Sequence, residues 1–211
     1  AEVREAWAEL AEVYEDVLMQ VSDPARMKTL RVELAELYRD RLDNAVDAEL
    51  HFGEALNLDE RDLEVYAALE AMLSAQERWQ DLIDLLERRY MVFAAEPDAR
   101  ALLLRIAQIY DEFLEDRFTA VDSYRRVLGE EPRDETAIAA VNRLLRAQDR
   151  WQDLADFLED QITLWADDAE RLVALRTELA QIYAGELFLP ERALELWRQI
   201  LADRPHHEPT V

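Results

Sequence analysis

Cysteine and histidine, which commonly act as nucleophiles or metal ligands, are rare in this sequence of 211 residues. It contains no cysteine, and its three histidines are His51, His206 and His207. A zinc site needs several converging ligands, and nothing in the spacing of these histidines suggests one. The absence of cysteine also excludes disulfides and thiol nucleophiles. We therefore expect no bound metal and no thiol chemistry.

The other candidates for catalysis are equally weak. The serines are Ser22, Ser74 and Ser123, and none stands in a strand-to-helix turn that would expose a nucleophile. The chain has only three glycines and no glycine-rich phosphate loop. Acidic neighbours such as Asp111 and Glu112 point apart on a helix, so they do not form a catalytic pair by themselves. The sequence predicts no enzyme, no catalytic residue and no cofactor.

The charge balance is strongly acidic, with 48 Asp and Glu against 24 Lys and Arg and a net charge of −24. Binding to nucleic-acid phosphates or to anionic membranes requires a basic surface, so we expect neither. No apolar run approaches the roughly 18 residues of a membrane span, which favours a soluble protein. The sequence identifies no compartment, and the cytoplasm is a default assumption. The acidity either attracts a basic partner or keeps a helical surface soluble, and both explanations stay open.

The sequence repeats itself with a period of 72 residues. Trp7, Trp79 and Trp151 stand at this interval, and the last two open the identical word Trp-Gln-Asp-Leu. The words that end in Tyr38, Tyr110 and Tyr183 recur at intervals of 72 and 73 residues. Ala48, Ala120 and Ala193 recur likewise, and each is followed four residues later by an aromatic residue. Repetition on this scale is typical of an array of structural repeats.

Within each period the apolar residues follow helical spacing, as in Leu30, Leu34 and Leu37. Pro24, Pro97 and Pro190 predict helix starts, the first two after a carboxylate residue. The predicted helices span about 3–20, 27–41, 45–57, 62–75, 78–93, 98–114, 117–129, 134–147, 150–166, 168–185 and 190–203. The period divides a single array over 1–211 into the tail of a preceding repeat (1–22), two full repeats (23–94 and 95–166), a partial third (167–205) and a polar tail (206–211).

Four helices per period form two hairpins of 36 residues, close to the roughly 34 of a tetratricopeptide unit. The sequence resembles that family at Leu34, Ala35, Tyr38, Ala48, Phe52 and Ala55, and at the hairpin-ending prolines Pro132 and Pro205. It departs from the family at Glu60, Glu70, Trp79, Leu82 and Asn142. The match is to the double-hairpin variant found in bacterial multi-repeat proteins. It implies an all-α, right-handed α-solenoid of about eleven antiparallel helices.

The resemblance also implies a concave face that binds a peptide or a partner helix. The matching groove positions are Glu36, Arg39, Asp40, Gln108, Asp111, Glu112, Arg143 and Arg146. Their charges are mixed, and the Lys and Asn clamp that some members use for a terminal carboxylate is missing. These residues either contact a partner or solvate an inner surface. We expect the repeated tryptophans and tyrosines to pack in the core.

We therefore expect a noncatalytic scaffold that binds a protein or peptide, with a basic partner as one option. The alternative is a regulatory or architectural segment of a larger protein whose catalytic or sensory domain lies elsewhere. The predicted helices at 3–20 and 190–203 each lack the neighbour that the period places beside them. We expect their outer faces to be covered by further repeats or by end-to-end self-association.

Overall fold

A computed structural model describes residues 2–203, and within that range the structure consists of helices, turns and loops without a strand. The elements are α1 (Glu2–Leu18), α2 (Pro24–Asp40), α3 (Ala45–Leu58), α4 (Leu63–Ala75), α5 (Trp79–Phe93), α6 (Ala99–Gln108), the π-helical turn η1 (Ile109–Phe113), α7 (Arg117–Glu130), α8 (Glu135–Ala147), α9 (Trp151–Leu164), α10 (Ala169–Gly185) and α11 (Pro190–Asp203). All the predicted helices are present, with ends that differ by at most three residues if η1 is counted with α6. The all-α class is confirmed. Pro205, His206, His207 and the predicted tail 206–211 lie outside the described residues.

Two details of the helix predictions are wrong. Pro97 does not begin a helix, because residues 94–98 form a turn in which the Glu96 amide donates to the Phe93 carbonyl, and α6 starts at Ala99. The predicted regular helix over 98–114 also changes to π-helical geometry at Ile109. Pro24, by contrast, is the first residue of α2, where the Asp23 carboxylate accepts the Arg26 amide at 3.1 Å.

The backbone repeats as regularly as the sequence. Each of α2, α4, α8 and α10, and also η1, is followed by a residue with φ between 51° and 55°. These residues are Asp43, Glu77, Glu115, Asp149 and Phe188. Just beyond Asp43, Glu115 and Phe188, an amide donates to the carbonyl of the repeated tyrosine at 2.7–2.9 Å. The left-handed residue thus reverses the chain at the same point of each hairpin, although glycine is the usual choice there.

The chain divides into two compact units, Ala1–Ile109 and Tyr110–Val211. In the first unit, alanines at 35, 48 and 55 are fully buried, and they allow α2 and α3 to approach closely beside Phe52 and Tyr66. In the second unit the matched residues Ala120, Tyr124 and Val127 are buried in the same way. Small residues at the helix contact and large ones around it therefore build both cores.

The repeated tryptophans are less buried than predicted. Trp7 packs against the cluster formed by α1 and α2, but it stays half-buried, with the Arg41 guanidinium 5.3 Å from its ring centre. Trp79 and Trp151, at the first positions of α5 and α9, are also half-buried. The fully enclosed aromatic side chains of the first unit are instead Phe52 and Tyr66.

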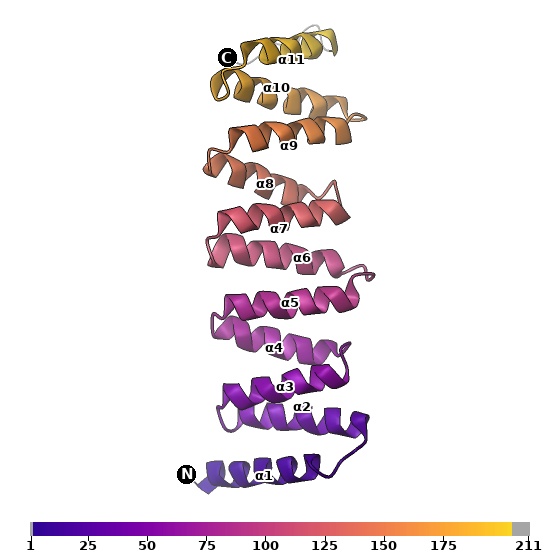
Figure 1. The fold of residues 1–211 in the computed structure, drawn as a ribbon, viewed down its shortest axis with the longest axis vertical. Coiled ribbons are helices and arrows are strands. Elements are labelled where there is room, and N and C mark those ends of the chain that lie inside the picture. The colour runs from indigo at the N-terminus through magenta and orange to yellow at the C-terminus, as the bar shows by residue number, and fades with distance from the viewer. Residues whose placement is uncertain (1, 204–211) are drawn as a thin grey trace. The chain divides into compact units, whose positions relative to one another are not determined.

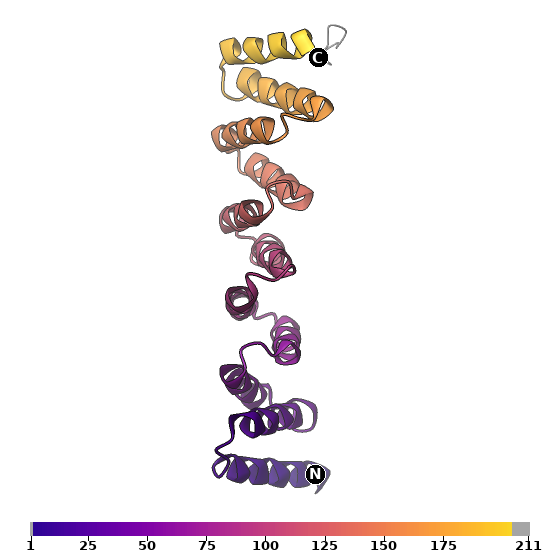
Figure 2. The ribbon, with the colours of Figure 1, turned by 90° about the vertical axis from the view of Figure 1, so that its right-hand side faces the viewer.

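Each unit has two faces. In the first unit α4 and α6 lie on one side and α3 and α5 on the other, and in the second unit α8 and α10 lie opposite α7 and α9 (Figures 1 and 2). We call the side formed by the even-numbered helices of a unit its even-helix face. All the groove residues predicted from the sequence stand on even-numbered helices or on η1.

Candidate functional site: a groove on the even-helix face of the first unit

A groove of about 690 Å³ opens among α4, α5 and α6. Buried Leu86 and Leu102 and half-buried Phe93 supply apolar surface, and Leu63 stands beside them with 51% of its surface exposed. Charged residues complete the lining, namely Arg61, Glu70, Arg89, Glu96, Asp98 and Arg105. We refer to this site as the α4–α6 groove. Its size and its combination of apolar surface with a few polar groups are typical of a binding site.

Two arginines of the groove are held by neighbouring side chains. Arg61 forms an ion pair with Glu96 at 2.6 Å, and its guanidinium lies 4.8 Å from the centre of the Phe93 ring. Arg89 pairs with Glu70 and lies 5.7 Å from the Tyr66 ring centre. These contacts fix the aromatic wall and orient the cations along it.

Asp98 differs from the other carboxylates of the groove. It precedes the first residue of α6 and is exposed, but its side chain caps no amide of that helix. An anion at a helix N-terminus is favoured by the helix dipole, so the position of Asp98 suits a carboxylate. The groove therefore presents an exposed carboxylate beside the exposed aliphatic side chain of Leu63.

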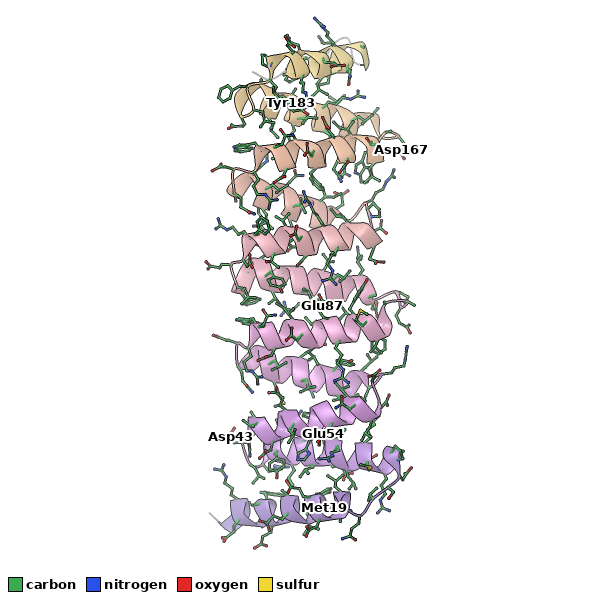
Figure 3. The ribbon with its side chains drawn as sticks, in the orientation of Figure 1. Met19, Asp43, Glu54, Glu87, Asp167 and Tyr183 are labelled. Atoms are coloured by element: carbon green, nitrogen blue, oxygen red, sulfur yellow. The ribbon has the colours of Figure 1, made fainter. Side chains whose placement is uncertain are left out.

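The corresponding position of the second unit is occupied by the chain's own side chains. There Trp165 lies between two guanidiniums, with Arg133 at 4.4 Å and Arg171 at 3.8 Å from its ring centre. Arg133 pairs with Asp167 at 2.8 Å, and Arg171 forms two hydrogen bonds of 2.5 and 2.6 Å with Glu135. We call these five residues the Trp165 cluster. Figure 3 labels Asp167, which marks the loop between α9 and α10.

The predicted site residues on α2 lie apart from the α4–α6 groove. Arg39 bonds both carboxylate oxygens of Asp40, at 2.7 and 2.9 Å, and lies 5.5 Å from the ring centre of Phe52. This bond lowers the pKa of Asp40. Glu36 and Asp40 line a smaller cavity of about 330 Å³ between α1 and α2.

Several of the other predicted residues form contacts within the fold. Asp111 of η1 has a side chain only 9% exposed, and it pairs with Arg143 of α8. It also accepts a hydrogen bond from Tyr124 at 3.4 Å, and burial together with this carboxylate raises the pKa of Tyr124 to about 12. Asp111 therefore already has partners inside the second unit. Its role in binding another protein remains a prediction.

The last three predicted positions are on α6, η1 and α8. Gln108 is half-buried near the end of α6, whereas Glu112 is exposed. Arg146 pairs with Glu178 of α10. Partner contacts of these residues likewise remain predictions. The structure does not bring the eight predicted residues into one cavity, because the α2 set lines a cavity with α1 and the α8 set pairs with η1 and α10.

The residues that form the α4–α6 groove were not predicted from the sequence. Leu63, Phe93 and Asp98 fall within the predicted helices 62–75, 78–93 and 98–114, and nothing in the sequence singled them out. A signal was nevertheless available in the repeat, because the residues one period later, Glu135 and Trp165, differ in charge or size. Such a difference between matched positions marks a place where the repeats are not equivalent.

His51 is the buried histidine of the described residues. Its Nδ1 accepts a hydrogen bond from Arg31 at 2.8 Å, and its ring stacks on Tyr38 with centres 5.5 Å apart. Burial and the Arg31 charge lower its pKa, so the ring is neutral at pH 7. Among residues 2–203 no three His, Asp or Glu side chains are arranged to hold a metal ion. In the same range, no helix combines the length and apolarity needed to cross a membrane.

No protein-family model and no curated protein matches this chain. Among solved structures, it is similar to YrrB, described as a TPR protein with an unusual peptide-binding site, with 16% identity over 93% of this chain and 95% of that one and a TM-score of 0.40. It is similar to pilF of Pseudomonas aeruginosa, with 16% identity, coverage of 98% and 94%, and a TM-score of 0.41. A TPR repeat-containing protein of Cytophaga hutchinsonii shows 15% identity, coverage of 96% and 92%, and a TM-score of 0.42.

At these identities and TM-scores the similarities assign no family and no partner to this chain. The structure itself supplies the pairing of the helices, in which each helix packs against the next along the chain within its unit. The chain is thus an all-α array of helical hairpins that resembles tetratricopeptide repeat proteins.

Proposed function

We propose that this protein is a noncatalytic scaffold that binds a peptide or helix of another protein on the even-helix face of its first unit. The observation that supports this most directly is the α4–α6 groove, where the exposed Leu63 adjoins buried apolar side chains inside a charged rim. Protein interfaces have this arrangement, with an apolar centre that excludes water and a polar border. The site residues predicted on α2 would extend the contact within the first unit.

The net charge favours a basic partner. At −24, the chain attracts cationic segments at long range, and the attraction weakens as salt screens it. Association with such a partner should therefore slow as the salt concentration rises, while dissociation should depend mainly on contacts in the groove. Binding that is indifferent to ionic strength would leave the acidity with a role in solubility only.

The proposal is tested by capturing partners with Leu63→Lys and with a matched control. Leu50 is similarly exposed, at 55% against 51%, but it belongs to α3 and lines a different cavity, with Val46 and Arg78. We expect Leu63→Lys to remove the partner from the eluate and Leu50→Lys to retain it. Both substitutions are at exposed positions, so each should change the free energy of unfolding by no more than about 0.5 kcal/mol. Equal retention by both variants would contradict a binding role for the groove.

A second candidate function is that of a segment within a larger protein, and the outer face of α1 supports it. Leu10 is 37% exposed, whereas its matched residues Leu82 and Leu154 are 2% and 0% exposed. Val13 is 57% exposed, and its counterpart Phe157 is 6% exposed. Both α5 and α9 bury the residue matched to Leu10, and α9 buries the residue matched to Val13, whereas α1 leaves both positions open to solvent.

The outer face of α11 shows the same contrast. Leu201 is 48% exposed, but the matched Leu56 of α3 is fully buried. Further repeats or a second copy of the chain would cover such surfaces. Sedimentation across a concentration series distinguishes these occupants. Association that Leu10→Glu and Leu201→Glu abolish supports self-association, and a monomer at all concentrations favours additional repeats.

A further inference from the structure

We propose that the α4–α6 groove binds an arginine side chain of the partner, at the place that Arg171 fills in the second unit. This inference rests on the proposed function and specifies the chemistry of the ligand. Both units place an arginine over an aromatic ring and pair that arginine with a carboxylate, and we call this arrangement the framework. In the second unit a further arginine, Arg171, also lies over the ring, and in the first unit no arginine stands at the matched position.

The matched positions are defined by the repeat. Phe93 and Trp165 are one period of 72 residues apart, and so are Arg61 and Arg133. The repeated words that end in Tyr110 and Tyr183 begin at Ile106 and Leu179. Asp98 stands eight residues before the first of these words, and Arg171 stands eight residues before the second. Asp98 and Arg171 are therefore matched in the sequence repeat; Asp98 immediately precedes α6, and Arg171 is the third residue of α10.

The framework consists of an arginine that stacks on an aromatic ring and pairs with a carboxylate. In the first unit Arg61 lies 4.8 Å from the Phe93 ring centre and bonds Glu96. In the second unit Arg133 lies 4.4 Å from the Trp165 ring centre and bonds Asp167. In each unit, therefore, an arginine that is paired with a carboxylate lies over the aromatic ring.

The residues beside the framework differ. In the Trp165 cluster Arg171 stacks on the ring at 3.8 Å and bonds both oxygens of Glu135. In the first unit the residue in place of Glu135 is Leu63, and the residue in place of Arg171 is the carboxylate Asp98. The first unit therefore has an open groove where the second has a guanidinium.

An arginine from a partner can contact three groups of this open site, Leu63, Phe93 and Asp98. Its aliphatic stem can cover the exposed Leu63, since arginine buries its methylenes along apolar surfaces. Its planar guanidinium can stack beside Phe93, as Arg171 does on Trp165, and can pair with Asp98 through two parallel hydrogen bonds. Lysine has the charge but not the planar group, and citrulline has the planar group but not the charge.

The direct test uses N-acetyl-L-arginine amide as the probe and the backbone amide NMR signals of the intact protein as the readout. We expect saturable shifts at Leu63, Phe93 and Asp98, with N-acetyl-L-citrulline amide binding at least about five-fold more weakly because it lacks the charge. Asp98→Asn should weaken arginine binding by a similar factor. Shifts spread over the acidic surface without saturation, or none in the groove, would overturn the inference.

A reciprocal exchange between the units provides the sharpest control. Leu63→Glu combined with Asp98→Arg gives the first unit the residues of the Trp165 cluster, and it should abolish the groove shifts. Glu135→Leu combined with Arg171→Asp gives the second unit the residues of the groove, and it should create new shifts at the Trp165 indole. Thermal unfolding of both variants verifies that each remains folded. A folded first variant that still binds arginine in the groove would contradict the proposal.

The two proposals fail separately. If Leu63→Lys removes the captured partner while the arginine probe leaves the groove unshifted, the inference about arginine is wrong and the scaffold function stands. If the probe binds in the groove but capture of the partner is unaffected by Leu63→Lys, the groove recognises arginine and the proposed binding face is wrong.

Discussion

The α4–α6 groove and the Trp165 cluster occupy matched places in the 72-residue repeat, one in each unit. The left-handed residues Glu77 and Asp149 end α4 and α8 at the same point, and an arginine stacks on an aromatic ring in both. Yet one place is an open groove and the other is closed by Arg171 and Glu135. In a repeat protein, then, the residues that recur build the scaffold, and the few that do not recur decide where it can bind.

The largest effect should come from removing the two matched aromatic side chains. Trp165 lies between two guanidiniums, whereas Phe93 has one guanidinium and an edge contact with Tyr66. We expect Trp165→Ala to lower the free energy of unfolding by about 2–4 kcal/mol and Phe93→Ala by about 1–3 kcal/mol, below the range for fully buried aromatics. Urea denaturation of both variants measures the difference. A larger decrease in the free energy of unfolding for Phe93→Ala than for Trp165→Ala would contradict this prediction. It would show that the aromatic side chain of the groove contributes more to stability than that of the Trp165 cluster.

A smaller effect concerns two matched buried residues, one on α3 and one on α7. His51 in the first unit and Ser123 in the second are matched and both are buried, but only His51 titrates. Because its pKa is lowered in the folded protein, the unfolded chain binds a proton more readily as the pH falls below about 6.5. The stability that neutral His51 contributes is therefore present above that pH and is lost as the pH falls towards the folded pKa.

His51→Gln keeps a hydrogen-bond acceptor for Arg31 and removes the titration. We expect this variant to be less stable than the parent at pH 7 by about 1 kcal/mol, since it loses the stack on Tyr38. The difference should shrink at pH 5. Urea denaturation at both pH values measures it, with Ser123→Ala as the matched control whose cost should not depend on pH. A difference that is constant with pH would mean that His51 takes up its proton without cost to the fold.

The smallest effect is the direct coupling of Arg171 with Glu135. The Arg171 guanidinium lowers the pKa of Glu135, but the Glu135 side chain is 64% exposed, so the pair is strongly screened. A double-mutant cycle of Arg171→Gln and Glu135→Gln should yield about 0.3–1 kcal/mol at low salt and less at high salt. The contribution is present above the unfolded pKa of Glu135 and is lost as the pH falls through the folded value. A coupling near zero at low salt would show that the stack on Trp165 alone holds Arg171.

Most of the fold followed from the sequence because its signals are local. Each helix is marked by apolar residues at three and four residue intervals, and acidic caps such as Asp23 and Asp62 precede them. Tyr66 and Ile138, which stand one period of 72 residues apart, both take buried positions, at 0% and 6% exposure. Neither the turn at Pro97 nor the π-helical turn at Ile109 was predicted, since each depends on how the chain meets its next helix.

The candidate site was predicted only in part. The family resemblance placed contacts on even-numbered helices, but it could not show that Asp111 would be buried against Arg143 and Tyr124. The resemblance also did not identify Leu63 and Asp98 as site residues. They are 35 residues apart in the sequence and line one groove. Such a site is formed by side chains from different helices. A local sequence pattern does not determine which of these side chains lie close together in the fold.

The sequence by itself therefore determined the helices, their order in hairpins and the period at which they recur, because these follow from spacing along one chain. Only the tertiary structure decided which repeat is open. The residues at the position of Arg171 and at the position of Glu135 come from different helices, and their charge or size matters only once the helices are packed. With a guanidinium and a carboxylate at these two positions the second unit closes its site, and with a carboxylate and an aliphatic side chain the first unit leaves its groove open.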